Sequence, residues 1–251
     1  MYQIAFTTVT FRKLNRAAIC EIAVKNNIPL IEWGADIHLP PSDTSAQNEI
    51  INLNNSLGLH ALSYGSYYYI GTRNYDEWKK ITQTAFSVGA KIIRVWLGNK
   101  SSCDVSDAML DEMIEETQIL ADIAREKGLI IAFEFHNGTY NDNGEKSKAF
   151  LDKVNRDNVK TYWQPFGTKD DEKNLLNILP YIISVHVFEW NKRGKRYSLK
   201  HGRKKWKKFI SIISKSKTDV NFIMEFVKGD SVRRFEKDLK ELRIMLKEIF
   251  T

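Results

Sequence analysis

The sequence predicts an α/β protein folded as one closed barrel of eight parallel strands, each followed by a helix. The 251 residues match the ~250 residues typical of a (β/α)8 (TIM) barrel. Short apolar runs alternate about eight times with segments whose apolar residues recur every three or four positions. No linker interrupts this alternation, so we expect a single domain covering residues 1–251.

The strand candidates are short and rich in β-branched and aromatic residues, a composition that favours strands. In chain order they cover residues 3–9, 29–34, 58–65, 91–98, 129–136, 159–164, 181–190 and 221–226. Apolar residues with a helical period fill most of the intervals between them, at 14–26, 44–57, 75–89 and 105–128. This order predicts repeated strand–helix units and therefore a parallel sheet.

Local signals mark where several helices begin and end. Gly58, Gly89 and Gly128 each stand between a helical segment and the next strand, where a glycine commonly ends a helix. Asn74 and Glu77 have the spacing of a capping box at the start of the third helix. The last helix, 231–250, is expected to close the barrel with its inward-facing residues Phe235, Leu239, Leu242 and Leu246.

The composition supports one core and excludes several classes of protein. Hydrophobic residues make up 43% of the chain, and no apolar run approaches the ~20 residues of a membrane span. The start of the chain, MYQIAFTTVTF, lacks the basic segment followed by an apolar stretch that marks a secretory signal. We therefore expect a cytoplasmic protein. Cys20 and Cys103 form no CxxC pair, and we interpret both as buried small hydrophobic residues.

Four apolar runs in the second half of the chain carry a polar residue near their carboxyl ends. LIIAFEFH holds Glu134, VKTYWQP holds Gln164, YIISVHVFEW holds His186 and NFIMEF holds Glu225. Strands buried on both faces rarely carry such residues, because an unpaired carboxylate is costly to bury. Metal binding or proton transfer is the usual compensation. Two glutamates, an imidazole and an amide oxygen are a plausible ligand set for Mn²⁺, Mg²⁺, Co²⁺ or Zn²⁺.

The carboxyl ends of the strands carry the chemistry of such a barrel. Aromatic and polar residues near these ends suit a polyhydroxylated small molecule, since rings stack on its C–H faces and polar groups bind its hydroxyls. Simpler explanations exist for several candidates: Glu32 and Arg94 can form structural ion pairs, and Trp96 can belong to the core. The candidate substrate-binding residues are Glu32, His38, Tyr64, Arg94, Trp96, His136, Glu189 and Arg193.

The strand-end segments AFEFHNGTY, YWQP, SVHVFEW and FIMEF resemble the xylose isomerase-like TIM barrel superfamily. That superfamily includes sugar and sugar-phosphate isomerases and epimerases, hydroxypyruvate isomerase, inosose dehydratase and apurinic endonucleases. The resemblance covers essentially the whole chain in strand order and length. In the ketose epimerases of this group the metal ligands are Glu, Asp, His and Glu, and these positions correspond to Glu134, Gln164, His186 and Glu225. Gln164 replaces the usual aspartate, which implies a site with two formal negative charges and weaker metal binding.

The resemblance implies a divalent-metal-dependent isomerase or epimerase of carbohydrate metabolism, acting on a sugar or sugar phosphate. Proton transfer next to a carbonyl would pass through an enediolate, with Glu134 and Glu225 as the catalytic pair. Three alternatives stay open: a lyase or dehydratase acting on a related polyol or keto acid, a catalytically altered sugar-binding barrel, and a nuclease. The nuclease is the least expected, because the repair enzymes of the superfamily use a site richer in histidine and aspartate.

The segment 191–217 contains twelve Lys or Arg residues and no Asp or Glu. It carries +12 in a chain whose net charge is +7, so the remainder of the chain is −5. A solvated basic helix face is the commonest explanation of such a run. Residues near the barrel rim, including Arg193, can instead hold a phosphate or carboxylate of the substrate. A nucleic-acid surface is the third interpretation. No membrane partner is expected, and members of the superfamily often self-associate.

Overall fold

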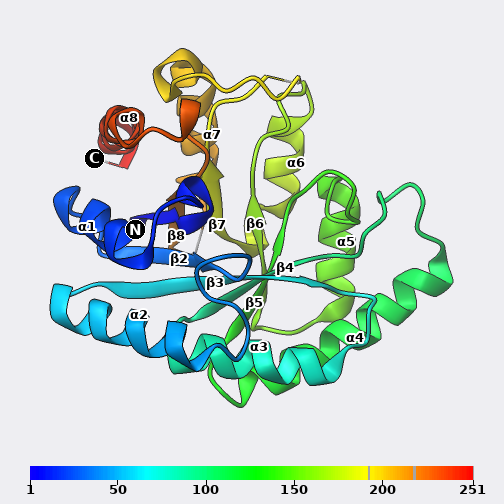
Figure 1. Ribbon diagram of the computed structural model, residues 1–251. Coiled ribbons are helices and arrows are strands. Elements are labelled where there is room, and N and C mark those ends of the chain that lie inside the picture. Colours follow the sequence, from blue (N-terminus) through cyan, green and yellow to red (C-terminus); the bar gives the residue numbers. More distant parts are fainter. Residues whose placement is uncertain (192, 217–218, 251) are drawn as a thin grey trace.

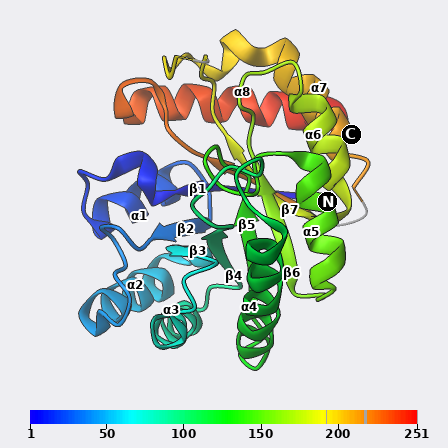
Figure 2. The same ribbon diagram turned by 90° about the vertical axis from the view of Figure 1, so that its right-hand side faces the viewer.

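The structure, a computed structural model, describes residues 1–191, 193–216 and 219–250. Eight parallel strands form a closed barrel in chain order, and β8 pairs with β1 to complete it (Figures 1 and 2). This confirms the predicted fold class. The strands are β1 (Tyr2–Thr7), β2 (Leu30–Gly34), β3 (His60–Tyr69), β4 (Ile92–Trp96), β5 (Ile130–Glu134), β6 (Val159–Trp163), β7 (Ile182–Val187) and β8 (Val220–Met224).

A ring of α-helices surrounds the strands (Figure 2). One helix follows each strand, as the alternating pattern in the sequence predicts. The helices are α1 (Arg16–Lys25), α2 (Thr44–Leu57), α3 (Tyr75–Ser87), α4 (Asp107–Arg125), α5 (Gly144–Val154), α6 (Asp171–Ile178), α7 (Arg203–Ile213) and α8 (Val232–Phe250). No helix of the described residues has both the length and the apolar composition needed to cross a membrane.

The predicted helix signals are confirmed in detail. Gly58, Gly89 and Gly128 all have positive φ, of 66°, 77° and 67°, which a residue with a side chain adopts only at a cost. Asn74 caps α3, because its Oδ1 accepts from the Glu77 amide at 3.2 Å and its Nδ2 donates to Glu77 Oε2 at 2.9 Å. Polar side chains and backbone turns therefore define these helix ends locally.

β3 continues beyond the end at residue 65 that the sequence pattern predicts. Its register against β4 shifts between Gly65 and Tyr69, and Tyr69 then pairs with Trp96. Within this irregular stretch Tyr67 has a φ of 59°, a strained conformation for an aromatic residue. The shift turns the Tyr67 ring towards Arg94 of β4, whose guanidinium carbon lies 5.6 Å from the ring centroid. An irregular strand therefore shapes the barrel mouth.

The hydrophobic core has two layers. A large layer lies between the barrel and the helices and includes the fully buried Trp33, Trp78, Trp163 and Trp206. A smaller layer fills the barrel interior with Ala5, Leu62, Ile92, Ala132, Tyr162 and Ile223. Because side chains alternate between the two faces of a regular strand, the residues two positions after Ile92, Ala132, Tyr162 and Ile223 also point inward. The interior apolar layer thus supports a polar layer nearer the carboxyl ends.

The last helix closes the molecule as predicted. Phe235, Leu239, Leu242 and Leu246 are each at most 1% exposed, and they form part of the layer between barrel and helices. Near the end of α8, the ring of Phe250 lies 4.8 Å from that of Tyr2 in β1, measured between centroids. The two ends of the chain accordingly lie on the same side of the barrel (Figure 1).

Asp238 of α8 gives a testable pH dependence. Its Oδ1 accepts from the Leu199 amide at 3.0 Å, and burial raises its pKa to about 6, helped by Glu241 and opposed by the Leu199 amide and Arg234. A raised carboxyl pKa favours the protonated folded state, so stability from this group is highest below about pH 4 and is lost as pH rises to about 6. Asp238→Asn keeps the acceptor and should remove this loss in urea unfolding measured at pH 4, 5 and 7. Asp111→Asn, at an exposed position, is the matched control; an equal pH response of Asp238→Asn and the parent would contradict the assignment.

Candidate active site

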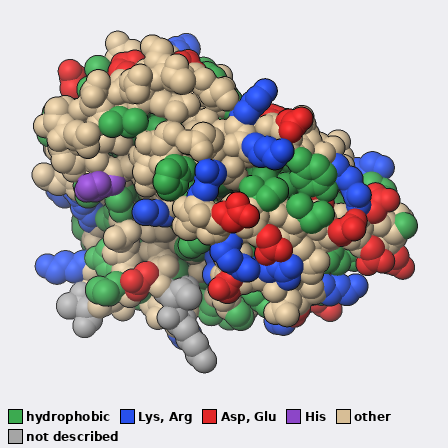
Figure 3. Space-filling view, turned by 90° about the horizontal axis from the view of Figure 1, so that it is seen from below, with side chains coloured by type: hydrophobic (Ala, Val, Ile, Leu, Met, Phe, Trp, Pro, Cys, Tyr) green, Lys and Arg blue, Asp and Glu red, His purple; other side chains and the backbone are tan. Residues whose placement is uncertain are grey.

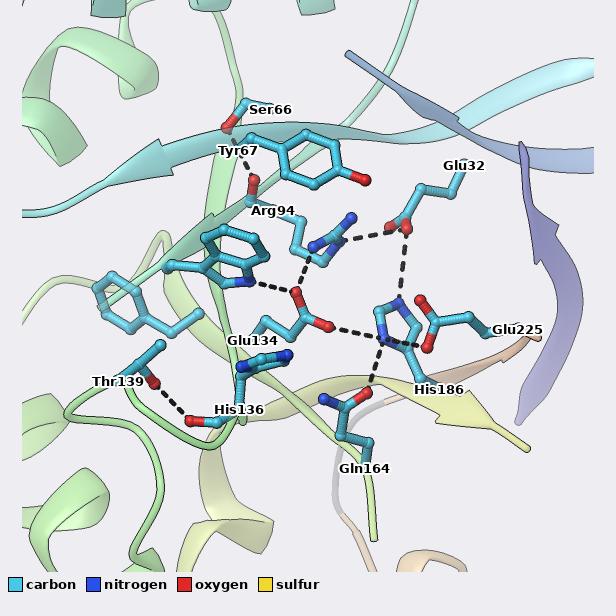
Figure 4. Close-up of polar contacts among 12 residues, drawn as sticks. Glu32, Ser66, Tyr67, Arg94, Glu134, His136, Thr139, Gln164, His186 and Glu225 are labelled. Atoms are coloured by element: carbon cyan, nitrogen blue, oxygen red, sulfur yellow. Dashed lines mark hydrogen bonds and ion pairs between the residues drawn. The ribbon is translucent and has the colours of Figure 1, made fainter. Parts of the chain in front are cut away.

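Five ionisable side chains meet inside the barrel at the carboxyl ends of its strands (Figure 4). They are at most 4% exposed and come from β2, β4, β5, β7 and the residue that follows β8. Glu134 and Glu225 each lie two positions after a residue of the interior apolar layer, so the alternation of the strand turns them inward. The five residues are Glu32, Arg94, Glu134, His186 and Glu225.

One nitrogen of His186 faces three oxygens. Its Nδ1 lies 3.4 Å from Glu134 Oε1, 3.4 Å from Glu225 Oε2 and 3.3 Å from Gln164 Oε1. These oxygens come from three different strands or strand ends, and Gln164 directly follows β6. The four residues singled out from the strand-end pattern therefore lie together around one point.

The other nitrogen of His186 faces Glu32. Its Nε2 lies 3.5 Å from Glu32 Oε1, which also accepts from Arg94 Nε at 3.2 Å. Ser63 Oγ donates to the second oxygen of Glu32 at 2.9 Å. A proton on Nε2 is therefore favoured by a carboxylate that is itself held in place. A metal ion bound here would replace the proton on Nδ1, and the Nδ1 lone pair would then point at the ion, as in a neutral imidazole ligand.

Arg94 binds one of the two Glu134 carboxylate oxygens and leaves the other free to face His186. The guanidinium Nη1 donates to Glu134 Oε2, and the Trp96 indole donates to the same oxygen at 2.6 Å. Glu134 Oε1 is left facing His186. Glu134 is thus oriented through one oxygen and presents the other to the cluster.

Gly65 provides the space that Arg94 occupies. A Cβ at position 65 would lie 2.6 Å from Arg94 Nη2 and 3.3 Å from its Cζ. Because Glu32 and Glu134 hold the guanidinium, Gly65→Ala is expected to cost about 1–3 kcal/mol of folding stability in urea unfolding, the usual range for overpacking. In an Arg94→Ala background the same change should cost much less. An equal cost in both backgrounds would show that Arg94 is not the clashing group.

Burial and charge shift the protonation of this cluster in opposite directions. Burial acts to raise the pKa of Glu32, but Arg94 and His186 outweigh it and lower the pKa to about 2. For Glu134, burial is likewise outweighed by Arg94 and His186, and the pKa stays well below its usual range. Burial raises the pKa of Glu225, against the attraction of His186. Burial would lower the pKa of His186, but the surrounding carboxylates raise it to about 10.

The donor set fits a divalent cation. Single donor atoms of Glu134, His186 and Glu225 all lie within 4.8 Å of one another, and the Gln164 carbonyl oxygen faces the same imidazole nitrogen. Three oxygens and one nitrogen suit Mn²⁺, Mg²⁺, Co²⁺ or Zn²⁺. These residues can therefore hold a metal ion.

Beside this cluster lies a cavity of about 210 Å³ at the barrel mouth. Gln164 is common to both, which joins the cavity to the proposed ligand set. His136 also lines the cavity, and its ring lies 5.5 Å from that of Trp96. Arg193 belongs to the loop whose Asn191 and Gly194 line the same cavity. The cavity wall is completed by Asn137, Pro165, Phe166, Phe188 and Trp190.

Three predicted substrate-binding residues lie elsewhere. The Tyr64 hydroxyl donates to the Leu39 carbonyl at 2.9 Å, His38 Nε2 lies 2.9 Å from the Leu14 carbonyl oxygen, and Glu189 pairs with Lys205 of α7 at 3.0 Å. Tyr64 belongs to the layer between barrel and helices, because the neighbouring Ser63 takes the inward direction. We therefore leave Tyr64, His38 and Glu189 out of the proposed site.

Sequence reasoning missed two residues of the cluster. Ser63 holds Glu32, and the Tyr162 ring lies 5.2 Å from the His186 ring. The sequence could have indicated that Tyr162 points into the barrel, because it lies two positions before Gln164 on the same strand face. The sequence gives no such indication for Ser63, since the irregular register of β3 decides the direction of its side chain.

Five of the ten described Lys and Arg residues in segment 191–217 pair with carboxylates of neighbouring elements. Arg196 pairs with Asp230 and Arg203 with Glu241 and Glu248. On α7, Lys205, Lys207 and Lys208 pair with Glu189, Glu248 and Glu172. Lys192 and Lys217 lie outside the described residues. On the face shown in Figure 3, basic side chains lie among acidic ones. The paired helix face is the interpretation that these contacts favour.

The protein is a closed (β/α)8 barrel with buried carboxylates, a histidine and an amide at its strand ends. These features define the class of barrel proteins that carry a polar site at the carboxyl face. The chain belongs to the xylose isomerase-like TIM barrel family, whose model matches residues 21–249. A search of curated proteins finds no match to this sequence.

Solved structures with the same fold share little sequence with this chain. The probable 3-DHS dehydratase AsbF of Bacillus anthracis, involved in petrobactin synthesis, superposes with a TM-score of 0.80 at 16% identity, covering 96% of this chain and 98% of that one. The IolI protein with a bound zinc atom gives 0.79 at 16%, covering 99% of both chains. D-allulose 3-epimerase of Methylomonas sp. in complex with D-allulose gives 0.76 at 17%, covering 99% and 97%. At these identities the likeness shows the fold.

Proposed function

We propose that this protein is a divalent-metal-dependent isomerase or epimerase of a sugar or sugar phosphate. The observation that carries the proposal is the convergence of Glu134, Gln164 and Glu225 oxygens on Nδ1 of His186. A divalent ion held by these four residues would supply a Lewis acid that polarises neighbouring substrate oxygens. Similar barrels bind zinc in IolI and D-allulose in an epimerase, which supports a metal and a polyol as the partners.

The two glutamates differ in how free they are to move a proton. Glu134 Oε2 already accepts from Arg94 and Trp96, so this residue is oriented and is held as an anion. Glu225 has no hydrogen bond from a described donor other than its contact with His186, leaving its Oε1 available to the substrate. Glu225 is therefore the group we propose to remove the proton from carbon and, once protonated, to return it, while Glu134, the other member of the pair, starts ionised and can accept a proton.

The cavity at the mouth would orient the substrate. Phe188 and Trp190 offer faces for C–H groups, while Gln164 and His136 offer polar groups for hydroxyls. Arg94 and Trp96 act on Glu134 and are proposed to position it. Glu32, through His186, positions the imidazole.

Dehydration is the second candidate, because the similar barrel AsbF is described as a probable dehydratase. Removal of a proton next to a carbonyl serves both reactions. Loss of a neighbouring hydroxyl as water would give a dehydratase, whereas return of the proton would give an isomerase or epimerase.

Glu225→Gln tests the proposal. NMR measures the rate at which carbon-bound hydrogen exchanges for solvent deuterium in a panel of ketoses, ketose phosphates and related keto acids. In Glu225→Gln this rate should fall about 10²–10⁴-fold, the usual contribution of a general base. Glu172→Gln, on the surface of α6, should leave exchange unchanged. Metal content measured on the same samples separates a lost ligand from a lost base. No exchange with any tested substrate by the metal-loaded parent protein would count against the proposal.

A further inference from the structure

Four basic side chains surround a hollow of about 420 Å³ where the β8–α8 loop joins α8. Lys228 belongs to the loop, and Arg233, Arg234 and Lys237 belong to the first turns of α8. The remaining lining residues are Gly229 and Ser231, so no carboxylate lines the hollow. Its volume lies within the ~300–1,000 Å³ typical of small-molecule sites.

The carboxylates of residues 228–238 contact groups outside the hollow. Asp230 pairs with Arg196 of the β7–α7 loop, and Glu236 pairs with Lys25 at the end of α1 at 2.7 Å. Asp238 accepts from the Leu199 amide. The sequence of residues 228–237 therefore shows only a modest excess of positive charge, while the folded chain separates its cations from its carboxylates.

None of the four lining cations forms an ion pair with a carboxylate of residues 1–191, 193–216 or 219–250. Four like charges around one concavity repel one another, and an anion in the hollow relieves that repulsion. Tetrahedral oxyanions accept several charge-assisted hydrogen bonds at once, and arginine matches their geometry. We propose that this basic hollow binds the phosphate group of a small molecule.

The hollow adjoins the barrel mouth. Gly229 also lines a neighbouring cavity of about 490 Å³, together with Arg12, Arg196 and Phe226. Phe226 directly follows Glu225, the proposed base. The phosphate can thus belong to the substrate, which rests on the proposed function, or to a separate phosphorylated ligand. Both sources present the same chemistry to the four cations.

Calorimetric titration of the whole protein with inorganic phosphate and pyrophosphate, at constant ionic strength in chloride, tests binding without relying on activity. We expect the double variant Arg233→Gln/Lys237→Gln to weaken phosphate binding at least fivefold. Lys240→Gln, an exposed position on the same helix outside the hollow, should change it less than twofold. Phosphate binding no stronger than chloride, or equally strong in the double variant, would overturn the proposal.

Two further measurements distinguish the sources. If phosphate competes with turnover of a ketose phosphate but not of the unphosphorylated ketose, the site holds the substrate's phosphate. If phosphate binds at the hollow without affecting either turnover, it serves a separate ligand; both results support the site. Binding of a duplex oligonucleotide that the double variant loses, with no binding of phosphate or pyrophosphate, would overturn the small-molecule proposal in favour of nucleic acid.

Discussion

Arg94→Met is expected to destabilise the folded protein by about 3–5 kcal/mol, because it leaves two buried carboxylates without their shared cation. Arg94 is 3% exposed and contacts both Glu32, at 0%, and Glu134, at 4%. Methionine fills much of the same volume, so most of the loss would come from charge. Urea unfolding monitored by tryptophan fluorescence measures it.

Arg203→Met is the matched control for this change. Arg203 also pairs with two glutamates, Glu241 and Glu248, but its side chain is 34% exposed. Exposed ion pairs contribute at most about 1 kcal/mol, so this variant should lose far less stability. Equal losses in the two variants would mean that the buried cluster tolerates Arg94 removal, for instance by protonating a glutamate.

Gln164→Glu is expected to tighten binding of Mn²⁺ or Zn²⁺ at least tenfold. The substitution keeps the length of the side chain and adds a negative charge facing the proposed metal position, near Glu134 and Glu225. Opposite charges about 4 Å apart attract by about 4 kcal/mol at an effective dielectric constant of 20, which leaves room for the cost of burial. Isothermal titration calorimetry with each metal measures the change.

The same substitution should lower the stability of the metal-free protein, because a third carboxylate then faces the cluster. Added metal should restore the melting temperature to the parent value or above. Gln83→Glu, on the exposed surface of α3, adds the same charge far from the cluster and should change neither quantity. Unchanged metal affinity in Gln164→Glu would indicate that residue 164 does not ligate the ion.

These two variants address different parts of one charge arrangement. Arg94 contacts Glu32 of β2 and one oxygen of Glu134 of β5, whereas the proposed metal faces the other oxygen of Glu134 and the ligands at the ends of β6, β7 and β8. A site with Gln164 therefore has two ligating carboxylates and one permanent cation close by. This arrangement is expected to bind metal more weakly than one with a third carboxylate.

Much of the fold could be predicted from local patterns. Short apolar runs mark the strands, apolar residues recurring every three or four positions mark the helices, and Asn74 and Gly128 mark helix ends. The convergence of Glu134, Gln164, His186 and Glu225 also follows from sequence, because the carboxyl ends of parallel barrel strands meet at one face. Buried polar residues at strand ends are rare enough to be informative.

Other features depend on register and on distant partners. Tyr64 satisfies every local criterion for a rim residue, yet an irregularity in β3 turns Ser63 inward and sends Tyr64 to the helix layer. The choice of Glu32 and Glu134 as partners of Arg94 requires three strands to be in place, with Gly65 leaving room between them. No single segment contains this information.

The surface charge, like the site, depends partly on local sequence and partly on tertiary structure. The sequence by itself determined the barrel, the order of its strands and the polar residues at their ends, because hydrophobic periodicity and strand polarity are local properties. The tertiary structure alone decided which cations of segment 191–217 pair with carboxylates, and that four cations without an ion pair to a described carboxylate surround one hollow: Lys228, Arg233, Arg234 and Lys237. Ion pairing depends on distances across elements far apart in the chain, and those distances exist only after folding.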